Sequence, residues 1–420
     1  MFSMSKRWML GLGLLLATAC GEDDLERADV EDAGRDAGGA LEASPDGGVQ
    51  DAHDSSTQST SPVVLVDAAT MDAGAVPQID AGDAATSNDA GDGAVALDSS
   101  VKDPGDAGDG DFTVSTFTIQ PELANLGKPR GKSFQFLMDS TKSKVFDGSD
   151  KTLVASKPRN LTRQINVYIP AQYKDGTKAP LLIIQDGPGP IDLISRGLDN
   201  LTISTDEMRR IPAFIAIAVQ NGGNDAQGSE RGLEYDTLSD RYARFIQEEV
   251  LPAVLADAKI KAAYPKLAFT EDPEGKASLG CSSGAAAAFT MAWFRPDLFR
   301  KVLSYSGTFV AQQTSGQPEA VTYPLGAWEY HSSKKIIDNT TPNVPIRAFL
   351  NVNEQDLGYN AAESGHHNWV LANQRMAAVL KDKGYHYRYA FAKGLGHCDG
   401  KAQQATLADA LVWLWAGYPH

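Results

Sequence analysis

The sequence predicts an α/β fold, with a mostly parallel central sheet and helices on both faces, preceded by a disordered tail. One observation is that apolar runs of strand length alternate with segments of helical periodicity from residue 112 onward. Such alternation is typical of a parallel sheet covered on both faces. The other is that no aromatic residue occurs between Trp8 and Phe112, so the core-forming side chains lie after that stretch.

The strand and helix signals follow one another in a regular order. The predicted strands, rich in Val, Ile, Leu, Phe and Ala, span 134–138, 165–169, 181–184, 214–219, 277–281, 302–305, 346–352 and 387–392. Apolar residues at helical spacing predict helices over 239–258, 285–294, 369–383 and 402–415. Residues 112–420 have a length that suits one domain of this class.

The first 19 residues predict export. They have a basic start, an apolar run and small residues at the end, as a secretory signal peptide does, and they are too short for a permanent membrane span. Residues 16–20 resemble a bacterial lipobox, which implies a lipid anchor on Cys20, although Ala17 stands where that motif usually has Leu. We therefore expect a membrane-anchored lipoprotein of the cell envelope. The alternative is ordinary cleavage after Ala19, which gives a secreted or periplasmic protein.

Residues 20–111 are predicted to form a disordered tether rich in Asp, Ala and Gly. Residues 1–111 contain 23 Asp and Glu against 5 Lys and Arg, whereas residues 112–420 contain 31 and 33. The net charge of −16 therefore belongs to the tail, which has too few apolar residues to offset its ordering entropy. Residues 112–420 show no basic stripe, so nucleic acid is not an expected partner.

The sharpest local signal is the Gly-x-Ser-x-Gly pattern of residues 280–284. A short predicted strand leads into it and an alanine-rich predicted helix leads out. This strand–turn–helix context is that of a nucleophile elbow, in which a strained turn lifts the serine hydroxyl above the sheet. We expect Ser282 to be the nucleophile, an α/β-hydrolase fold, and a domain spanning residues 112–420.

A serine hydroxyl needs a base within hydrogen-bond reach and an acid that orients the base. His397 follows the last predicted strand, where the base of this fold lies, and the other histidines fit that place less well. The acid is expected after the preceding strand, where Glu354 and Asp356 both occur. The pattern alone leaves these two carboxylates open.

Several stretches resemble the putative esterase family that includes esterase D-like enzymes and enterochelin esterase. The matching stretches are 166–170, 185–187, 231–252, 280–284, 295–302, 306–307 and 371–376. The resemblance implies a serine esterase that forms an acyl-enzyme, and it favours Asp356 as the acid. It also implies an oxyanion hole made by the backbone N–H groups of Ser283 and of the loop at Gly187. Ala285 departs from the family pattern, which usually has another Gly there.

Cys281 and Cys398 flank the predicted nucleophile and base. Ser282 and His397 must come within about 3 Å for proton transfer, so their neighbours are brought close as well. A Cys-Ser … Asp … His-Cys order is similar to that of fungal tannases and feruloyl esterases, in which such cysteines form a disulfide. We expect a bridge, which an exported protein permits. Two free buried thiols are the alternative.

The remaining expectations concern the substrate and the rival functions. No His-x-x-x-His or Cys-x-x-Cys pair is present, so neither a metal nor a cofactor is expected. The expected partners are a small-molecule or carbohydrate-linked ester (acetyl, feruloyl or siderophore) and a membrane through the lipid anchor. Residues 309–343 are expected to cap the site, with Tyr323, Trp328 and Tyr330 either stacking on a sugar or packing the cap. The rivals are a catalytically silent binding protein and a cysteine hydrolase using Cys281.

Overall fold

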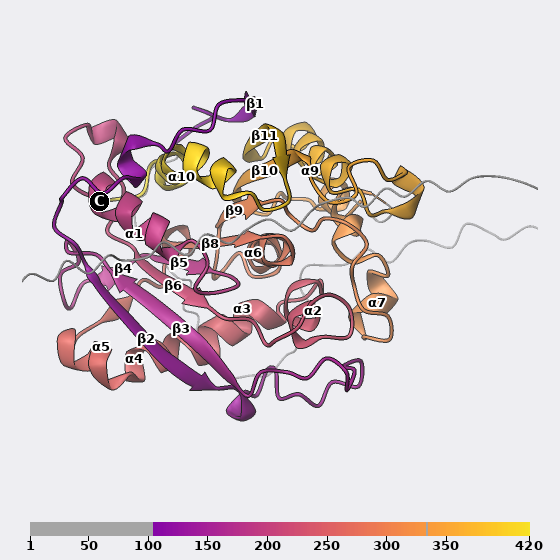
Figure 1. The fold of residues 1–420 in the computed structure, drawn as a ribbon, viewed down its shortest axis with the longest axis horizontal. Coiled ribbons are helices and arrows are strands. Elements are labelled where there is room, and N and C mark those ends of the chain that lie inside the picture. Colours follow the sequence, from indigo (N-terminus) through magenta and orange to yellow (C-terminus); the bar gives the residue numbers. More distant parts are fainter. Residues whose placement is uncertain (1–103, 333–334) are drawn as a thin grey trace, which may run out of the picture. The chain divides into compact units, whose positions relative to one another are not determined.

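The computed structural model describes residues 104–332 and 335–420, and these form a nine-stranded sheet with helices on both faces (Figure 1). The strand order is β1-β11-β10-β9-β8-β5-β6-β3-β2. The strands are β1 Gly110–Val114, β2 Lys132–Asp139, β3 Thr162–Ile169, β5 Leu181–Ile184, β6 Ile215–Val219, β8 Lys276–Cys281, β9 Lys301–Tyr305, β10 Arg347–Gln355 and β11 His386–Gly396. A separate two-stranded ribbon pairs β4, Lys178–Ala179, with β7, Ala268–Phe269.

The sheet is parallel from β1 to β6, and only β3 and β2 run antiparallel to their neighbours. The central strands β5 and β6 are buried along their whole length. Strands covered on both faces carry near-continuous apolar runs, which explains why these segments were readable from the sequence. The predicted α/β class with a mostly parallel sheet is confirmed.

Each face of the sheet is covered by its own set of helices. Alternate side chains of β5 point to opposite faces, so Leu182 and Ile184 pack with α1 and α10 while Leu181 and Ile183 pack with α3, α4, α6 and α9. The helices are α1 Ile191–Leu201, α2 Glu230–Tyr235, α3 Arg241–Phe245, α4 Leu251–Ala256, α5 Ala258–Ala263, α6 Ser283–Phe294, α7 Glu319–Thr322, α8 Ile336–Asn339, α9 Trp369–Asp382 and α10 Gly400–Trp415. The helix expected over 239–258 is α3 and α4 joined by one π-helical turn, Ile246–Val250.

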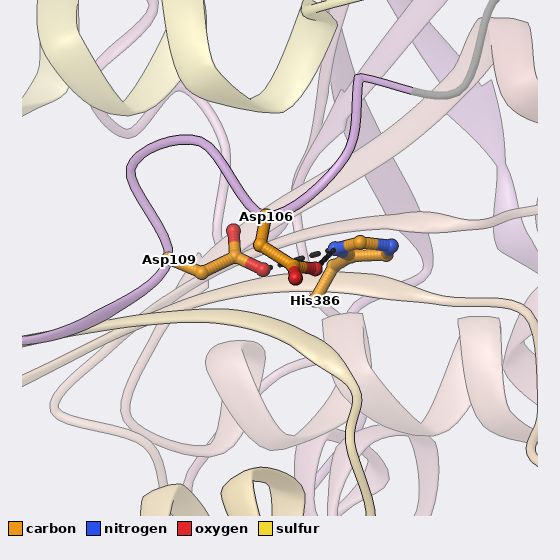
Figure 2. A group of neighbouring side chains, drawn as sticks. All are labelled: Asp106, Asp109 and His386. Atoms are coloured by element: carbon orange, nitrogen blue, oxygen red, sulfur yellow. Dashed lines mark hydrogen bonds and ion pairs between the residues drawn. The ribbon is translucent and has the colours of Figure 1, made fainter.

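The domain begins earlier than the sequence predicted. Gly110 and Asp111, which we assigned to the tether, lie in β1 and pair with the start of β11. Just before them, Asp109 accepts a hydrogen bond from Nδ1 of His386 at 2.9 Å (Figure 2). Asp109 also accepts one from the indole N–H of Trp413 at 2.9 Å. The tether boundary at residue 111 is therefore wrong, because the end of that acidic segment adds an edge strand to the sheet.

The signal peptide, Cys20 and the tether up to residue 103 lie outside the described residues, so those predictions stay predictions. Among the residues that are described, no helix is both long enough and apolar enough to cross a membrane.

Candidate active site

Ser282 lies at the turn between β8 and α6 and has φ 60° and ψ −131°, a strained conformation for a residue with a side chain. The turn is tight enough that a Cβ on Gly280 would overlap the Gly284 carbonyl. The carbonyl oxygen of Ser282 accepts from the N–H groups of the first turn of α6 and from that of Thr308, at 3.0–3.2 Å. The local structure is the strand–turn–helix arrangement that the sequence analysis expected around Ser282.

His397 and Asp356 form a hydrogen bond, with Nδ1 of His397 2.5 Å from Oδ1 of Asp356. Asp356 is 1% exposed. Burial alone would raise the pKa of this carboxyl, but hydrogen bonds from His397 and Ser306 outweigh burial and hold it below its usual value. Glu354, the other candidate, points away and binds the ammonium of Lys393 at 2.8 Å.

Sheet order explains why residues so far apart in sequence meet. β8, β9, β10 and β11 are consecutive parallel neighbours, so the residues after their carboxyl ends share one edge of the sheet. Across that edge Cys281 and Cys398 form a disulfide with Cα atoms 6.0 Å apart, between residues separated by 117 positions. The expected bridge is present, and it ties the residue before Ser282 to the residue after His397.

Sequence reasoning gave no role to the turn that follows β9. The hydroxyl oxygen of Thr308 lies 3.3 Å from that of Ser282 and accepts from the indole N–H of Trp369 at 3.2 Å. The Trp369 ring in turn meets the His397 ring edge-on, with centroids 6.2 Å apart. Nothing in a Ser-Gly-Thr tripeptide distinguishes such a turn from an ordinary strand end, although residues 306–307 belong to the stretches that carry the family resemblance.

The loop after β5 lies beside the elbow, because a Cβ on Gly284 would sit 3.0 Å from a carboxylate oxygen of Asp186. The expectation that the N–H of Gly187 contributes to the oxyanion hole does not fit this loop. The N–H of Gly187 donates to the carbonyl of Val219 at 2.9 Å, so it is not available to an oxyanion. The N–H of Asp186 donates to the hydroxyl of Tyr235 at 3.1 Å, and residues 188 and 190 are prolines without an N–H. Gly189 is the remaining N–H of this loop.

Helix α2 holds the loop after β5 through Arg231, which binds Asp186. Arg231 makes two parallel hydrogen bonds of 2.9 Å to the carboxylate of Asp186, whose backbone is left-handed with φ 54°. At the end of α2, Asp236 is 3% exposed, and neither of its carboxylate oxygens has a hydrogen-bond donor in standard geometry. Burial therefore raises the pKa of Asp236 to about 7, although the Ser283 hydroxyl and the Arg231 charge lie close enough to lower it somewhat.

Of the two roles open to the aromatics of residues 309–343, packing is what the structure shows for Trp328 and Tyr330. Trp328 is 2% exposed and Tyr330 is fully buried. Tyr330 packs edge-on against Phe289 of α6 and donates its hydroxyl to Thr290. Trp328 packs instead against the rings of His331 and His366. Both aromatic rings are buried by packing, so neither presents a face to a sugar.

Within the described residues, Asp106, Asp109 and His386 form a group that has metal-ligand chemistry (Figure 2). This group lies where β11 begins, whereas His397 lies just beyond its end. The guanidinium of Arg347 is 3.6 Å from Asp109, and a fixed cation at that distance opposes a second cation. The three side chains are better described as a contact between the start of the domain and β11.

The chain is similar to a known protein family and to several solved structures. The family model described as "Putative esterase" matches residues 156–414. Curated protein sequences gave no match. A ferulic acid esterase from Anaeromyces mucronatus, solved in complex with ferulic acid, is similar over 73% of this chain and 99% of its own, with 14% identity and a TM-score of 0.48. The enterobactin esterase of Shigella flexneri is similar over 71% of this chain and 62% of its own, with 18% identity and a TM-score of 0.45.

Proposed function

Because the chain belongs to the putative esterase family and is a carboxylic ester hydrolase, we propose that it works through an acyl-enzyme on Ser282. His397 takes the proton of the Ser282 hydroxyl as its oxygen attacks the ester carbonyl. Asp356 holds the imidazole in the tautomer that accepts this proton at Nε2. The alcohol leaves with a proton from His397, and water then hydrolyses the acyl-enzyme by the same acid–base pair.

The hydrogen bond between His397 and Asp356 is the observation that supports this proposal most directly. The Asp356 carboxylate that His397 contacts is only 1% exposed, which a histidine with a purely surface role would not require. The disulfide between Cys281 and Cys398 joins the loop of His397 to the turn of Ser282. For the oxyanion, the N–H of Ser283 in the first turn of α6 supplies one donor, since first-turn N–H groups lack an intrahelical partner. Gly189 supplies the second in place of Gly187.

The decisive experiment is covalent labelling. A fluorophosphonate probe should modify Ser282, as read by peptide mass spectrometry, and Ser282→Ala should abolish both labelling and hydrolysis of p-nitrophenyl acetate. Ser204→Ala, in a loop that follows α1, is the control and should keep both. Labelling of another residue, or turnover by Ser282→Ala, would contradict the assignment. Absence of turnover in the native protein would favour the silent binding alternative.

The cysteine alternative loses its support in this structure. Cys281 is bonded to Cys398, and a disulfide sulfur has no thiolate with which to attack an ester. Hydrolysis that persists under oxidising conditions separates the two mechanisms, because a cysteine hydrolase requires the reduced thiol.

For the substrate we propose an extracellular small-molecule or carbohydrate-linked ester. Leu357 and Tyr359, directly after the acid, are 45% and 47% exposed and offer an apolar surface at the catalytic edge. A panel of acetyl, feruloyl, siderophore and methyl-glucuronoyl esters, ranked by kcat/KM, tests this. We also propose export with a lipid on Cys20. Loss of palmitate labelling in Cys20→Ala, with the native protein labelled, is the expected result.

A further inference from the structure

The turn Ser306-Gly307-Thr308 lies between the nucleophile and the acid–base pair. β9 is flanked by β8, which ends just before Ser282, and by β10, which ends just before Asp356. Ser306 is fully buried with φ 48°, and Thr308 is 1% exposed. The middle of the turn is held from α9, where the side-chain amide of Asn373 donates to the carbonyl of Gly307 at 2.8 Å. Two hydroxyls are thereby fixed at the catalytic edge.

The hydrogen-bond partners of the Thr308 hydroxyl indicate where it accepts and where it can donate. An indole N–H is only a donor, so Trp369 uses a lone pair of the Thr308 oxygen. The single hydroxyl hydrogen of Thr308 is then free to be donated to the Ser282 oxygen, 3.3 Å away. If Ser282 accepts from Thr308, its own hydrogen remains for His397.

The Ser306 hydroxyl serves the other half of the site in the same way. Its oxygen accepts the N–H of Cys398, the residue after the base, at 3.1 Å. Burial raises the pKa of the Asp356 carboxyl, and the nearby Ser306 hydroxyl, after His397, acts to lower it. One side chain therefore bridges the loop of the acid and the loop of the base.

Resting on the triad assignment above, we propose that this turn is a fourth component of the active site. Thr308 is a catalytic residue that donates its O–H to Ser282 Oγ, and Ser306 is a positioning residue for Asp356 and His397. When the Oγ–carbon bond forms, the Ser282 proton passes to Nε2 of His397. The Thr308 hydrogen bond strengthens as negative charge develops on Oγ, both at attack and when Oγ leaves in deacylation.

Thr308→Val keeps the shape of the side chain and removes its hydroxyl. We expect kcat and kcat/KM for p-nitrophenyl acetate to fall together by about 10- to 100-fold, the range for one hydrogen bond to a charged group, with KM unchanged. Thr308→Ser should recover to within about threefold of the native kcat. Thr406→Val is the matched control. Its hydroxyl is also buried and hydrogen-bonded, to Tyr305 and to the Ala402 carbonyl, but lies on α10, so its kcat should be native.

Ser306→Ala is tested with a measurement that reports on the hydrogen bond between His397 and Asp356 and not only on the stability of the fold. We expect the downfield proton NMR resonance of His397 Nδ1–H, shared with Asp356, to shift or broaden in Ser306→Ala and to stay in place in Thr308→Val. A folded Thr308→Val enzyme with native kcat, or an unchanged resonance in Ser306→Ala, overturns the corresponding half of the proposal. Turnover by Ser282→Ala would instead overturn the proposed function itself, so the two failures are distinguishable.

Discussion

Two buried aspartates lie near the turn of Ser282, and their surroundings shift the pKa values of their carboxyl groups in opposite directions. Asp356, after β10, is 1% exposed, and the pKa of its carboxyl is lowered because the hydrogen bonds from His397 and Ser306 outweigh burial. Asp236, after α2, is 3% exposed, and burial raises the pKa of its carboxyl to about 7. The exposures hardly differ, so the hydrogen bonds that each carboxyl receives, above all the one from His397 to Asp356, decide the direction of the pKa shift.

The difference in pKa indicates which of the two aspartates is suited to be the ionised partner of His397 in the proposed mechanism. A buried carboxylate that stabilises an imidazolium has to stay ionised, and hydrogen bonds hold the pKa of the Asp356 carboxyl low enough for this. On the other side of Ser282, beside the proposed oxyanion donor Ser283, an unpaired negative charge would oppose a developing oxyanion. There, Asp186 is neutralised by Arg231, and Asp236 binds a proton more readily.

The largest expected effect sharpens this comparison at Asp356. Asp356→Asn should lower kcat for p-nitrophenyl acetate by about 10³- to 10⁴-fold, because an amide favours the wrong tautomer of His397. Asp236→Asn, measured in the same assay, should stay within about tenfold of native, since the replacement only makes permanent a neutral state that burial already favours. Comparable losses in both variants would show that the two aspartates are not functionally distinct.

The second effect concerns the disulfide between Cys281 and Cys398, which lies on the same side of Ser282 as Asp356. The double variant Cys281→Ser with Cys398→Ser should lose roughly 2–4 kcal/mol of unfolding free energy, as expected for a long closed loop. In the native protein, a dithiothreitol titration should reduce turnover before tryptophan fluorescence reports unfolding. Cys20→Ser is the control for the third cysteine. Simultaneous loss of activity and fold would mean that the bridge stabilises the domain without aligning His397.

The third effect is on the pH dependence of stability. The folded-state pKa of Asp236, about 7, lies above the ordinary value of 3.8, so the folded protein binds more protons than the unfolded chain between these values. The contribution of Asp236 to the unfolding free energy therefore falls as pH rises from about 4 to about 7. Asp236→Asn should remove this penalty and stabilise the domain by about 3 kcal/mol more at pH 8 than at pH 5. Urea titrations at the two pH values measure it, and an equal effect at both would contradict the raised pKa.

The smallest expected effect is at Glu354, the carboxylate two residues before the acid. Its partners are Lys393 and the N–H of Gly394, and none of them touches His397. Glu354→Gln should therefore change kcat by less than about twofold, in line with the small contribution of exposed ion pairs. A loss approaching that of Asp356→Asn would reopen the choice of acid.

The sequence was sufficient where local pattern and sheet position agree. The apolar runs of β5 and β6 and the strand–turn–helix context of Ser282 are local, and the rule that parallel strands end at one edge led from there to His397. Local pattern could not separate Glu354 from Asp356. β10 continues to Gln355, so Glu354 still lies in the strand and binds Lys393 of β11, whereas Asp356 follows the strand and contacts the imidazole.

The failures have equally specific causes. Gly187 was assigned as an oxyanion donor because glycine permits close approach, but its N–H pairs with Val219 of the neighbouring strand, which no local pattern shows. β1 was missed because a five-residue edge strand beginning Gly-Asp pairs on one side only and follows an acidic segment without a break. Ser306 and Thr308 acquire partners from β8, β10 and α9, so their roles exist only in the folded chain.

The direction of β1 determines at which end of β11 the described chain enters the domain. β1 runs parallel to β11, with Gly110 opposite Arg388, so the chain enters the domain at the edge of the sheet where β11 begins (Figure 1). His397 lies nine residues further along, about 30 Å away at 3.3 Å per residue. The start of the described chain and the proposed catalytic edge therefore lie at opposite ends of β11. The lipid anchor that we propose on Cys20 would precede the end of the domain that lies away from the proposed nucleophile.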